Sequence, residues 1–199
     1  MLHVENNFSS LTVMSLIELP NGWLASGYDD DIIRIWDVNS GQITKTLKGH
    51  KNSVICLAVL PHKNFSYHLA SGSTDDTVRI WNLESNTVRV LRGHKNSITS
   101  LAVLSDNMMA SGSTDTTIKI WKPHISVLIR TLIGHTKYVN TLVVVQDGRL
   151  ASGSNDKTIR IWNIDTGSSI KLEGHTARIS SLVVLPDGLL GKKIIENLS

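Results

Sequence analysis

The chain has 199 residues, of which 41% are hydrophobic, enough to bury the core of one medium-sized domain. Its 20 basic and 17 acidic residues leave a net charge of +3, which gives little attraction to nucleic acid or to a membrane surface. The single cysteine, Cys56, excludes a disulfide framework within the chain, and its apolar neighbours predict a small buried strand residue. With no apolar run of membrane-spanning length and no secretory signal, we expect a protein of the cytoplasm or nucleus.

Two sequence markers recur along the chain with nearly constant spacing. A stretch of the type Leu-Ala-Ser-Gly-Ser-Thr-Asp ending in a tryptophan occurs at 24–37, 69–82, 109–122 and 150–163. The dipeptide Gly-His occurs at 49–50, 93–94, 134–135 and 174–175, and both markers recur every 40 to 45 residues. This periodicity indicates tandem copies of one supersecondary unit.

Each period contains four strand-like runs. In the second period they are Val54 to Leu60, Tyr67 to Ser73, Thr77 to Asn82 and Thr87 to Leu91, separated by short turn sequences. Such runs predict an antiparallel meander. The first run is apolar throughout, as expected of a strand covered on both faces, and the more polar fourth run is expected to be outermost. Because one sheet cannot cover both of its own faces, the sheets must stack on one another.

The combination of Gly-His with a terminal Trp-Asp dipeptide resembles the WD-repeat family of β-propellers. The resemblance covers about nine tenths of the chain, from Leu11 to Leu190. Trp36-Asp37 matches the dipeptide, whereas Trp81, Trp121 and Trp162 are followed by Asn, Lys and Asn. The resemblance implies an all-β fold, a β-propeller built from four-stranded antiparallel blades.

We expect one propeller domain over residues 1–199. Its blades would span approximately 8–47, 50–91, 94–132 and 135–172, followed by a partial blade at 175–190 and a divergent tail at 191–199. The tryptophan of the fifth repeat would fall beyond Ser199, so the propeller is expected to be incomplete, an open arc of about four blades plus a stub, as in a fragment or a short form. Closure into a small ring and completion by a second copy are the alternatives. The open arc would expose apolar blade faces that could self-associate.

The family resemblance implies a hydrogen-bonded set of His, Ser, Asp and Trp in each repeat. The three complete sets are His50, Ser71, Asp75 and Trp81; His94, Ser111, Asp115 and Trp121; and His135, Ser152, Asp156 and Trp162. Ser73, Ser113 and Ser154 could take the serine role instead. The first repeat has Ser26, Asp30 and Trp36, but Ser9 lies near the place of its histidine.

The same residue types could form a hydrolase triad, an alternative that the repetition argues against. A catalytic triad occurs once in an active site, whereas this set occurs three times in register. We therefore expect no catalytic residues and a non-enzymatic protein. The repeated histidines lie about 40 residues apart with a single cysteine in the chain, so we expect no metal site and no cofactor. His3, His62, His68 and His124 are expected to lie at the surface.

The resemblance implies a rigid scaffold that binds proteins or peptides at the mouth of the channel. The expected partner-binding residues follow Gly-His on the innermost strand or precede the tetrad aspartate: Ser53, Ile55, Ser97, Thr99, Tyr138, Asn140, Arg178, Thr74, Thr114 and Asn155. Tyr138 and Arg178 are of the types enriched at binding hot spots. We expect no small-molecule substrate, nucleic acid or membrane partner. The alternative function is the substrate-recognition propeller of a larger multidomain protein, such as a ubiquitin-ligase receptor.

Overall fold

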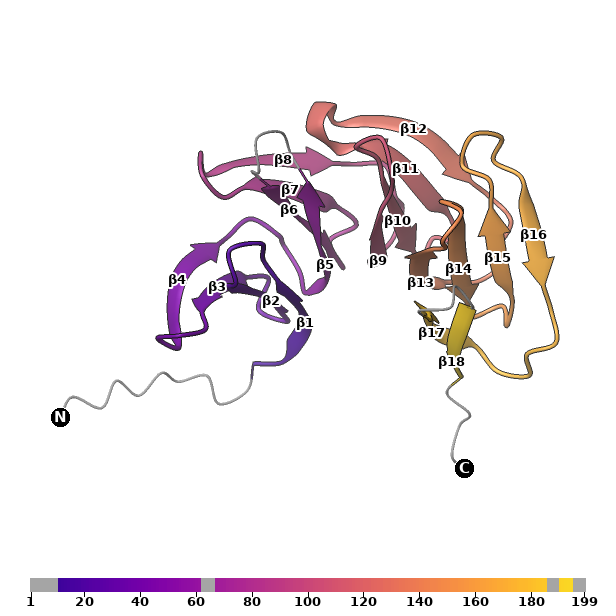
Figure 1. The fold of residues 1–199 in the computed structure, drawn as a ribbon, viewed down its shortest axis with the longest axis horizontal. Helices are drawn as coiled ribbons and strands as arrows, with labels where there is room; N and C mark the ends of the chain where they lie inside the picture. The colour runs from indigo at the N-terminus through magenta and orange to yellow at the C-terminus, as the bar shows by residue number, and fades with distance from the viewer. Residues whose placement is uncertain (1–10, 62–66, 186–189, 195–199) are drawn as a thin grey trace.

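A computed structural model of the protein describes residues 11–61, 67–185 and 190–194 (Figure 1). It contains four four-stranded sheets and one two-stranded sheet. The first sheet contains β1 (Val13–Glu18), β2 (Leu24–Tyr28), β3 (Ile33–Asp37) and β4 (Gln42–Leu47). The second contains β5 (Val54–Pro61), β6 (Tyr67–Ser73), β7 (Val78–Asn82) and β8 (Thr87–Leu91). The third contains β9 (Ile98–Val103), β10 (Met109–Ser113), β11 (Ile118–Lys122) and β12 (Val127–Leu132), with a 3-10 turn η1 (Pro123–Ile125) before β12. The fourth contains β13 (Val139–Val144), β14 (Leu150–Ser154), β15 (Ile159–Trp162) and β16 (Ser169–Leu172), and β17 (Ile179–Val184) pairs with β18 (Leu190–Ile194).

Every sheet is an antiparallel meander in which the strands pair in chain order. The strands of the second repeat begin and end within one residue of the predicted runs. Their composition explains the agreement, because small and β-branched residues alternate within the strands and Asp or Asn occupies the turns. The predicted all-β fold of four-stranded blades is confirmed.

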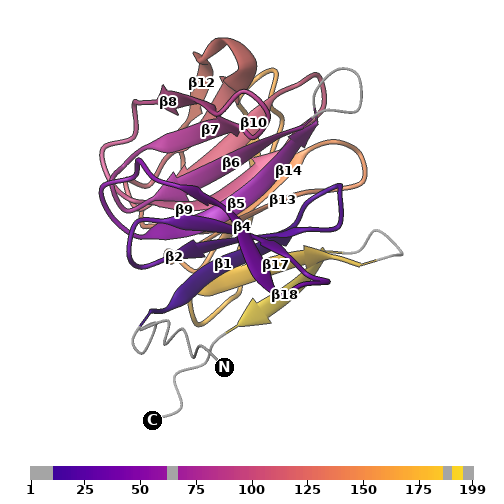
Figure 2. The same cartoon turned by 90° about the vertical axis from the view of Figure 1, so that its left-hand side faces the viewer.

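The blades stack through their first strands and follow an open arc. β1, β5, β9, β13 and β17 contact one another in succession along the inner side of the arc (Figure 1). Seen from the side, successive sheets lie face to face as layers (Figure 2). The fourth strands lie outermost and are largely exposed, as in β8 and β16. The blades do not close into a small ring, and the predicted incomplete propeller is confirmed.

Close packing between blades depends on glycines in the second strands. A Cβ atom added to Gly72 would lie 2.5 Å from Ile98 Cγ2 of the next blade and 2.7 Å from the Cys56 sulfur. Gly27, Gly112 and Gly153 meet the innermost strand of the following blade in the same way. The Ser-Gly-Ser sequence therefore lets two sheets approach each other directly.

The structure differs from the sequence expectations at β18 and at His68. β18 continues the partial blade to Ile194, four residues into the segment assigned to the divergent tail, because strand pairing uses backbone groups and does not require the Ala-Ser-Gly-Ser sequence. His68 is only 6% exposed, so its expected surface position is wrong. Its ring lies edge-on to that of His124 between the second and third blades, with 5.4 Å between the ring centroids. Ser9, His3, His62 and the ends of the expected first blade and tail lie outside the described residues.

No helix within the described ranges combines the length and the apolar character needed to cross a membrane.

Gly72→Ala is expected to destabilise the protein by about 1–3 kcal/mol, because the added methyl group must displace Ile98 or the sulfur of Cys56 in a packed interface. Urea unfolding followed by circular dichroism measures the change. Lys51→Ala, at an exposed loop position, is the control and should change the free energy of unfolding by less than about 0.5 kcal/mol. Equal stability of Gly72→Ala and the wild type would contradict the proposed tight contact.

Candidate functional site

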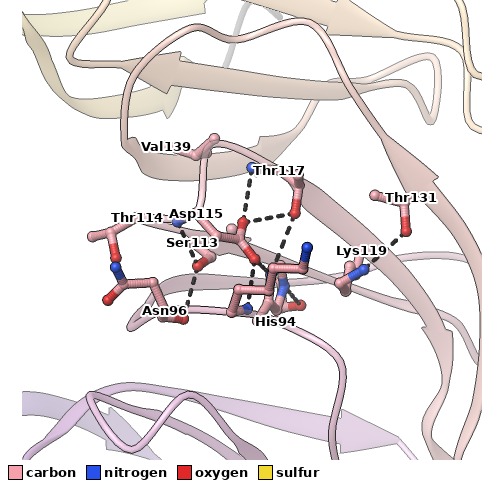
Figure 3. A network of polar contacts seen from close by, with 12 residues as sticks. His94, Asn96, Ser113, Thr114, Asp115, Thr117, Lys119, Thr131 and Val139 are labelled. Atoms are coloured by element: carbon pink, nitrogen blue, oxygen red, sulfur yellow. Dashed lines mark hydrogen bonds and ion pairs between the residues drawn. The ribbon is translucent and has the colours of Figure 1, made fainter.

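The turn between the second and third strands of each blade is built around an aspartate. In the third blade, Asp115 Oδ1 accepts hydrogen bonds from the backbone N–H of Thr117 (2.9 Å) and from its hydroxyl (2.7 Å). Ser113 Oγ accepts from the Asp115 N–H (3.0 Å) and donates to the Asn96 carbonyl (2.9 Å). These bonds fix the turn and leave Asp115 Oδ2 facing the Gly-His loop (Figure 3).

A chain of side-chain hydrogen bonds joins this turn to the sheet. In the third blade, Trp121 Nε1 lies 2.8 Å from Ser111 Oγ, His94 Nε2 lies 2.8 Å from the same oxygen, and His94 Nδ1 lies 2.8 Å from Asp115 Oδ2. The carboxylate can only accept, so Nδ1 carries the proton. The indole can only donate, so the serine hydroxyl donates in turn to Nε2.

The second and fourth blades contain the same chain with distances of 2.7 to 2.9 Å, formed by His50, Ser71, Asp75 and Trp81 and by His135, Ser152, Asp156 and Trp162. The structure thus chooses between the two serines that the sequence left open. Ser73, Ser113 and Ser154 instead bind backbone groups of the turn and of the Gly-His loop. The difference follows from position along the strand. Both serines point to the same face of β6, but Ser71 lies within the strand beside the indole and the imidazole, whereas Ser73 is its last residue and meets the turn.

The buried environment keeps these imidazoles neutral. Burial lowers the pKa of His94, and the Asp115 carboxylate only partly offsets this effect. Burial alone would raise the pKa of Asp115, but the Lys95 N–H, the Thr117 hydroxyl and the imidazole together lower it to about 2. His50, His135, Asp75 and Asp156 show shifts in the same directions.

The Ser-His-Asp geometry resembles a hydrolytic triad, but the serine cannot act as a nucleophile. Ser111 is 0% exposed, as are Ser71 and Ser152. Each hydroxyl oxygen is already occupied by an indole N–H, so no substrate carbonyl can approach it. The arrangement does structural work: it ties the loop between two blades to the sheet of the second.

In the first blade an arginine contacts the turn aspartate. Trp36 Nε1 donates to Ser26 Oγ (2.7 Å), as in the other blades. Asp30, however, pairs with Arg34 of β3, at 2.6 and 3.1 Å. The guanidinium lowers the pKa of the Asp30 carboxyl, and its carbon lies 4.5 Å from the centre of the Tyr28 ring. Among the described residues, the turn of the first blade is therefore held by an arginine of its own sheet.

The predicted mouth residues lie together at one end of the innermost strands. Thr74 N–H donates to the Ser53 carbonyl (3.1 Å), Thr114 N–H to the Ser97 carbonyl (3.0 Å) and Asn155 N–H to the Tyr138 carbonyl (2.9 Å). The second residue of each inner strand occupies a β-bulge: Met14, Ile55, Thr99, Asn140 and Ser180. Bulges redirect side chains and are common beside binding sites. Sequence reasoning did not find these bulges.

The mouth residues differ in how far they are available to a partner. The Thr99 hydroxyl donates to carbonyls of Gly112 and Val139, and the Asn140 amide donates to the Ile179 carbonyl and Asn155 Oδ1. These two side chains therefore bridge adjacent blades. Ser53, Ile55, Ser97, Thr74, Thr114 and Asn155 are half-buried. Tyr138, which is 50% exposed, and the exposed Arg178 offer the largest free side chains.

The cysteine thiol is not activated, and the described acidic residues do not gather into a metal site. Burial raises the pKa of the Cys56 thiol to about 12, so it is not a thiolate at neutral pH. Cys56 is half-buried rather than fully buried. Within the described ranges, no group of three or more His, Cys, Asp or Glu side chains is placed to hold a metal ion.

Acidification is expected to weaken the fold in two steps. The tetrad histidines and aspartates have lowered pKa values when folded, so the unfolded chain binds protons first as the pH falls. Stability should be constant above about pH 7, decrease below about pH 6.5 as histidines charge, and decrease again from about pH 4 towards 2 as the carboxylates protonate. Urea unfolding at a series of pH values measures this dependence. His94→Gln should reduce the slope between pH 7.5 and 5, and stability that stays constant or rises over that interval would contradict the assignment.

Comparison with known proteins places these features in a family. The chain matches the WD40 family, described as WD domain, G-beta repeat, over residues 10–37, 41–82, 85–122 and 126–163. Each match after the first begins near the outermost strand of one blade and ends with the third strand of the next. The family repeat therefore spans two blades and includes the Gly-His loop between them.

The relatives are longer proteins. Cell division control protein 4 of Saccharomyces cerevisiae is 41% identical over 46 residues, which cover 23% of this chain and 6% of that protein. Mitochondrial division protein 1 of Eremothecium gossypii is 38% identical over 45 residues, again 23% of this chain and 6% of the relative.

A solved structure described as the structure of U3-55K superposes with a TM-score of 0.78 and 25% identity, covering 87% of this chain and 55% of that chain. The chain thus spans about half of that structure and a small part of the curated relatives. Four family matches, the meander blades and the repeated hydrogen-bonded chain agree, and the protein belongs to the WD40 repeat family.

Proposed function

We propose that the chain is a non-catalytic scaffold that binds a protein or peptide partner across the mouth formed by the inner strands of its third to fifth blades. The observation that carries this proposal is the exposure of Tyr138 and Arg178 at the entry of two successive inner strands. Tyrosine and arginine supply a large contact area and several hydrogen bonds at interfaces. Propellers of this family generally mediate protein interactions.

The rigid frame around these residues supports the proposal. Tyr138 and Arg178 each follow a Gly-His loop, and in the fourth blade His135 and Asp156 hold that loop to the sheet. A side chain that is presented by fixed backbone loses less entropy on binding than one on a mobile loop. The residues at this end differ between blades while the hydrogen-bonded frame repeats, as expected of a binding site carried by a common scaffold.

A second candidate function is that of the recognition propeller within a larger multidomain protein, such as a ubiquitin-ligase receptor. The length of the relatives favours this candidate, because the matched segments cover only 6% of them. An antibody raised against this chain tests it in cells. A dominant endogenous product far larger than the 21.9 kDa of the chain would support it. For either candidate we favour the cytoplasm or nucleus, since one cysteine and no disulfide suit a reducing compartment.

Tyr138→Ala and Arg178→Ala are each expected to weaken capture of the partner by about tenfold or more, because each removes a large exposed contact group. Affinity capture from cell extract with quantitative mass spectrometry measures the loss, and the partners lost from both variants should coincide. Lys122→Ala, exposed at the opposite end of the third blade, is the matched control. The same set of captured proteins in all four samples would contradict the mouth as the binding surface.

A further inference from the structure

A cavity of about 460 Å³ lies between the first and second blades, at the end of the sheets opposite the Gly-His loops. We call it the blade-joint pocket; its lining residues are Asn21, Trp23, Ile35, Thr44, Lys45, Tyr67, Leu83 and Glu84. They come from the β1–β2 turn, from β3 and β4 of the first blade, and from the start of β6 and the β7–β8 turn of the second. The volume is in the range of pockets that hold small ligands or peptide side chains.

The neighbouring joint carries two histidines at the corresponding repeat positions. Trp23 and His68 occupy the same position in their repeats, one residue before the repeated Leu-Ala-Ser-Gly. Glu84 and His124 each stand three residues after the repeated tryptophan. At the joint between the second and third blades, these positions hold the edge-on pair His68 and His124, 5.4 Å apart. The first joint has a tryptophan and a carboxylate at the same places, with a cavity between the blades.

The walls of the pocket are apolar and rigidly supported. Trp23, Tyr67 and Leu83 are partly buried and pack against the hydrophobic cluster of the first two blades, and Ile35 belongs to that cluster. The backbone carbonyl of Trp23 accepts from Leu19 N–H (2.8 Å), which fixes the turn. Trp23 is also the one tryptophan of five that stands outside the repeated positions. An apolar side chain entering here would meet an aromatic residue from each blade, Trp23 of the first and Tyr67 of the second.

The charged groups of the rim determine what can lie beside that side chain. Lys45 Nζ donates to the Leu83 carbonyl and to Asn86 Oδ1 (2.7 Å), so this cation is already committed to the β7–β8 turn. Glu84 is exposed, and no basic residue in the described ranges pairs with its carboxylate. Burial, followed by the charge of Glu84, raises the pKa of the Tyr67 phenol, which therefore stays neutral. The Glu84 carboxylate is thus available to a cation, whereas the Lys45 ammonium is directed to the β7–β8 turn.

We propose that the blade-joint pocket binds a peptide segment of a partner protein, which inserts one large apolar side chain between Trp23 and Tyr67 and pairs an adjacent Lys or Arg with Glu84. The site lies at the opposite end of the sheets from Tyr138 and Arg178, so it is a second interaction surface. It does not depend on the proposed mouth surface.

Selection of peptides on the purified full chain tests the proposal. A display library of random linear peptides is screened on the wild type, and an enriched peptide is synthesised and titrated by fluorescence polarisation. We expect the enriched peptides to share an apolar residue beside Lys or Arg.

Trp23→Ala should weaken the affinity for the titrated peptide about tenfold or more. Glu84→Gln should weaken it about two- to fivefold, because an exposed ion pair contributes little. Tyr138→Ala and Arg149→Ala, the latter at the repeat position of Trp23 in the fourth blade, are controls that should bind as the wild type does.

Glu84→Lys keeps the test independent of folding, since the side chain is exposed. Selection on this variant should replace the basic residue of the enriched peptides with Asp or Glu, a change that no purely structural role of Glu84 would cause. The proposal is overturned if no peptide is enriched, if the enriched peptides bind Trp23→Ala with unchanged affinity, or if Glu84→Lys selects the same peptides as the wild type. A concentration-dependent dimer that Trp23→Ala abolishes would also overturn it, by identifying a second copy as the occupant.

Discussion

The rest of the structure depends on the hydrogen bonds that one buried serine hydroxyl makes in each of the four-stranded blades. Ser111 Oγ accepts from the indole of Trp121 and donates to His94, whose other nitrogen holds Asp115. These four residues come from two strands, a turn and the loop that enters the blade. Removing any one of them leaves a buried polar partner without a hydrogen bond, which lowers the free energy of unfolding by about 1–3 kcal/mol. The hydrogen-bonded chain thereby ties the loop that connects two blades to the sheet of the second.

The first blade shows which parts of this design can vary. It keeps the indole and the hydroxyl of Trp36 and Ser26 but anchors Asp30 through Arg34 of its own sheet. The turn therefore needs a donor for its carboxylate, and either an imidazole from the loop or a guanidinium from the neighbouring strand supplies one. The glycine contact varies less. Gly27 meets Val54 of the next blade as Gly72 meets Ile98, because no side chain fits between the sheets there.

The sequence predicted the features that repeat and missed those that occur once or depend on register. The strands and their order followed from periodic apolar runs and turn residues, and the open arc followed from the number of repeats together with the family resemblance. The choice of Ser111 over Ser113 did not, because both serines point to the same face and only the exact end of β10 places Ser111 beside the indole and Ser113 beside the turn. The burial of His68 was missed because its partner His124 lies 56 positions away in the next blade. β18 was missed because backbone pairing tolerates a sequence that departs from the repeat.

For the same reason, the sequence predicted one of the two candidate binding surfaces and not the other. Tyr138 stands at a fixed offset from Gly-His, so comparing repeats was enough to single it out. The blade-joint pocket combines a turn of the first blade with a turn of the second, and Trp23 and Glu84 are 61 residues apart in the chain. Only the stacking of blades brings them together. In a fold whose frame is repeated, individual function arises where the repeats differ, and some of those differences meet only at joints that a single repeat does not contain.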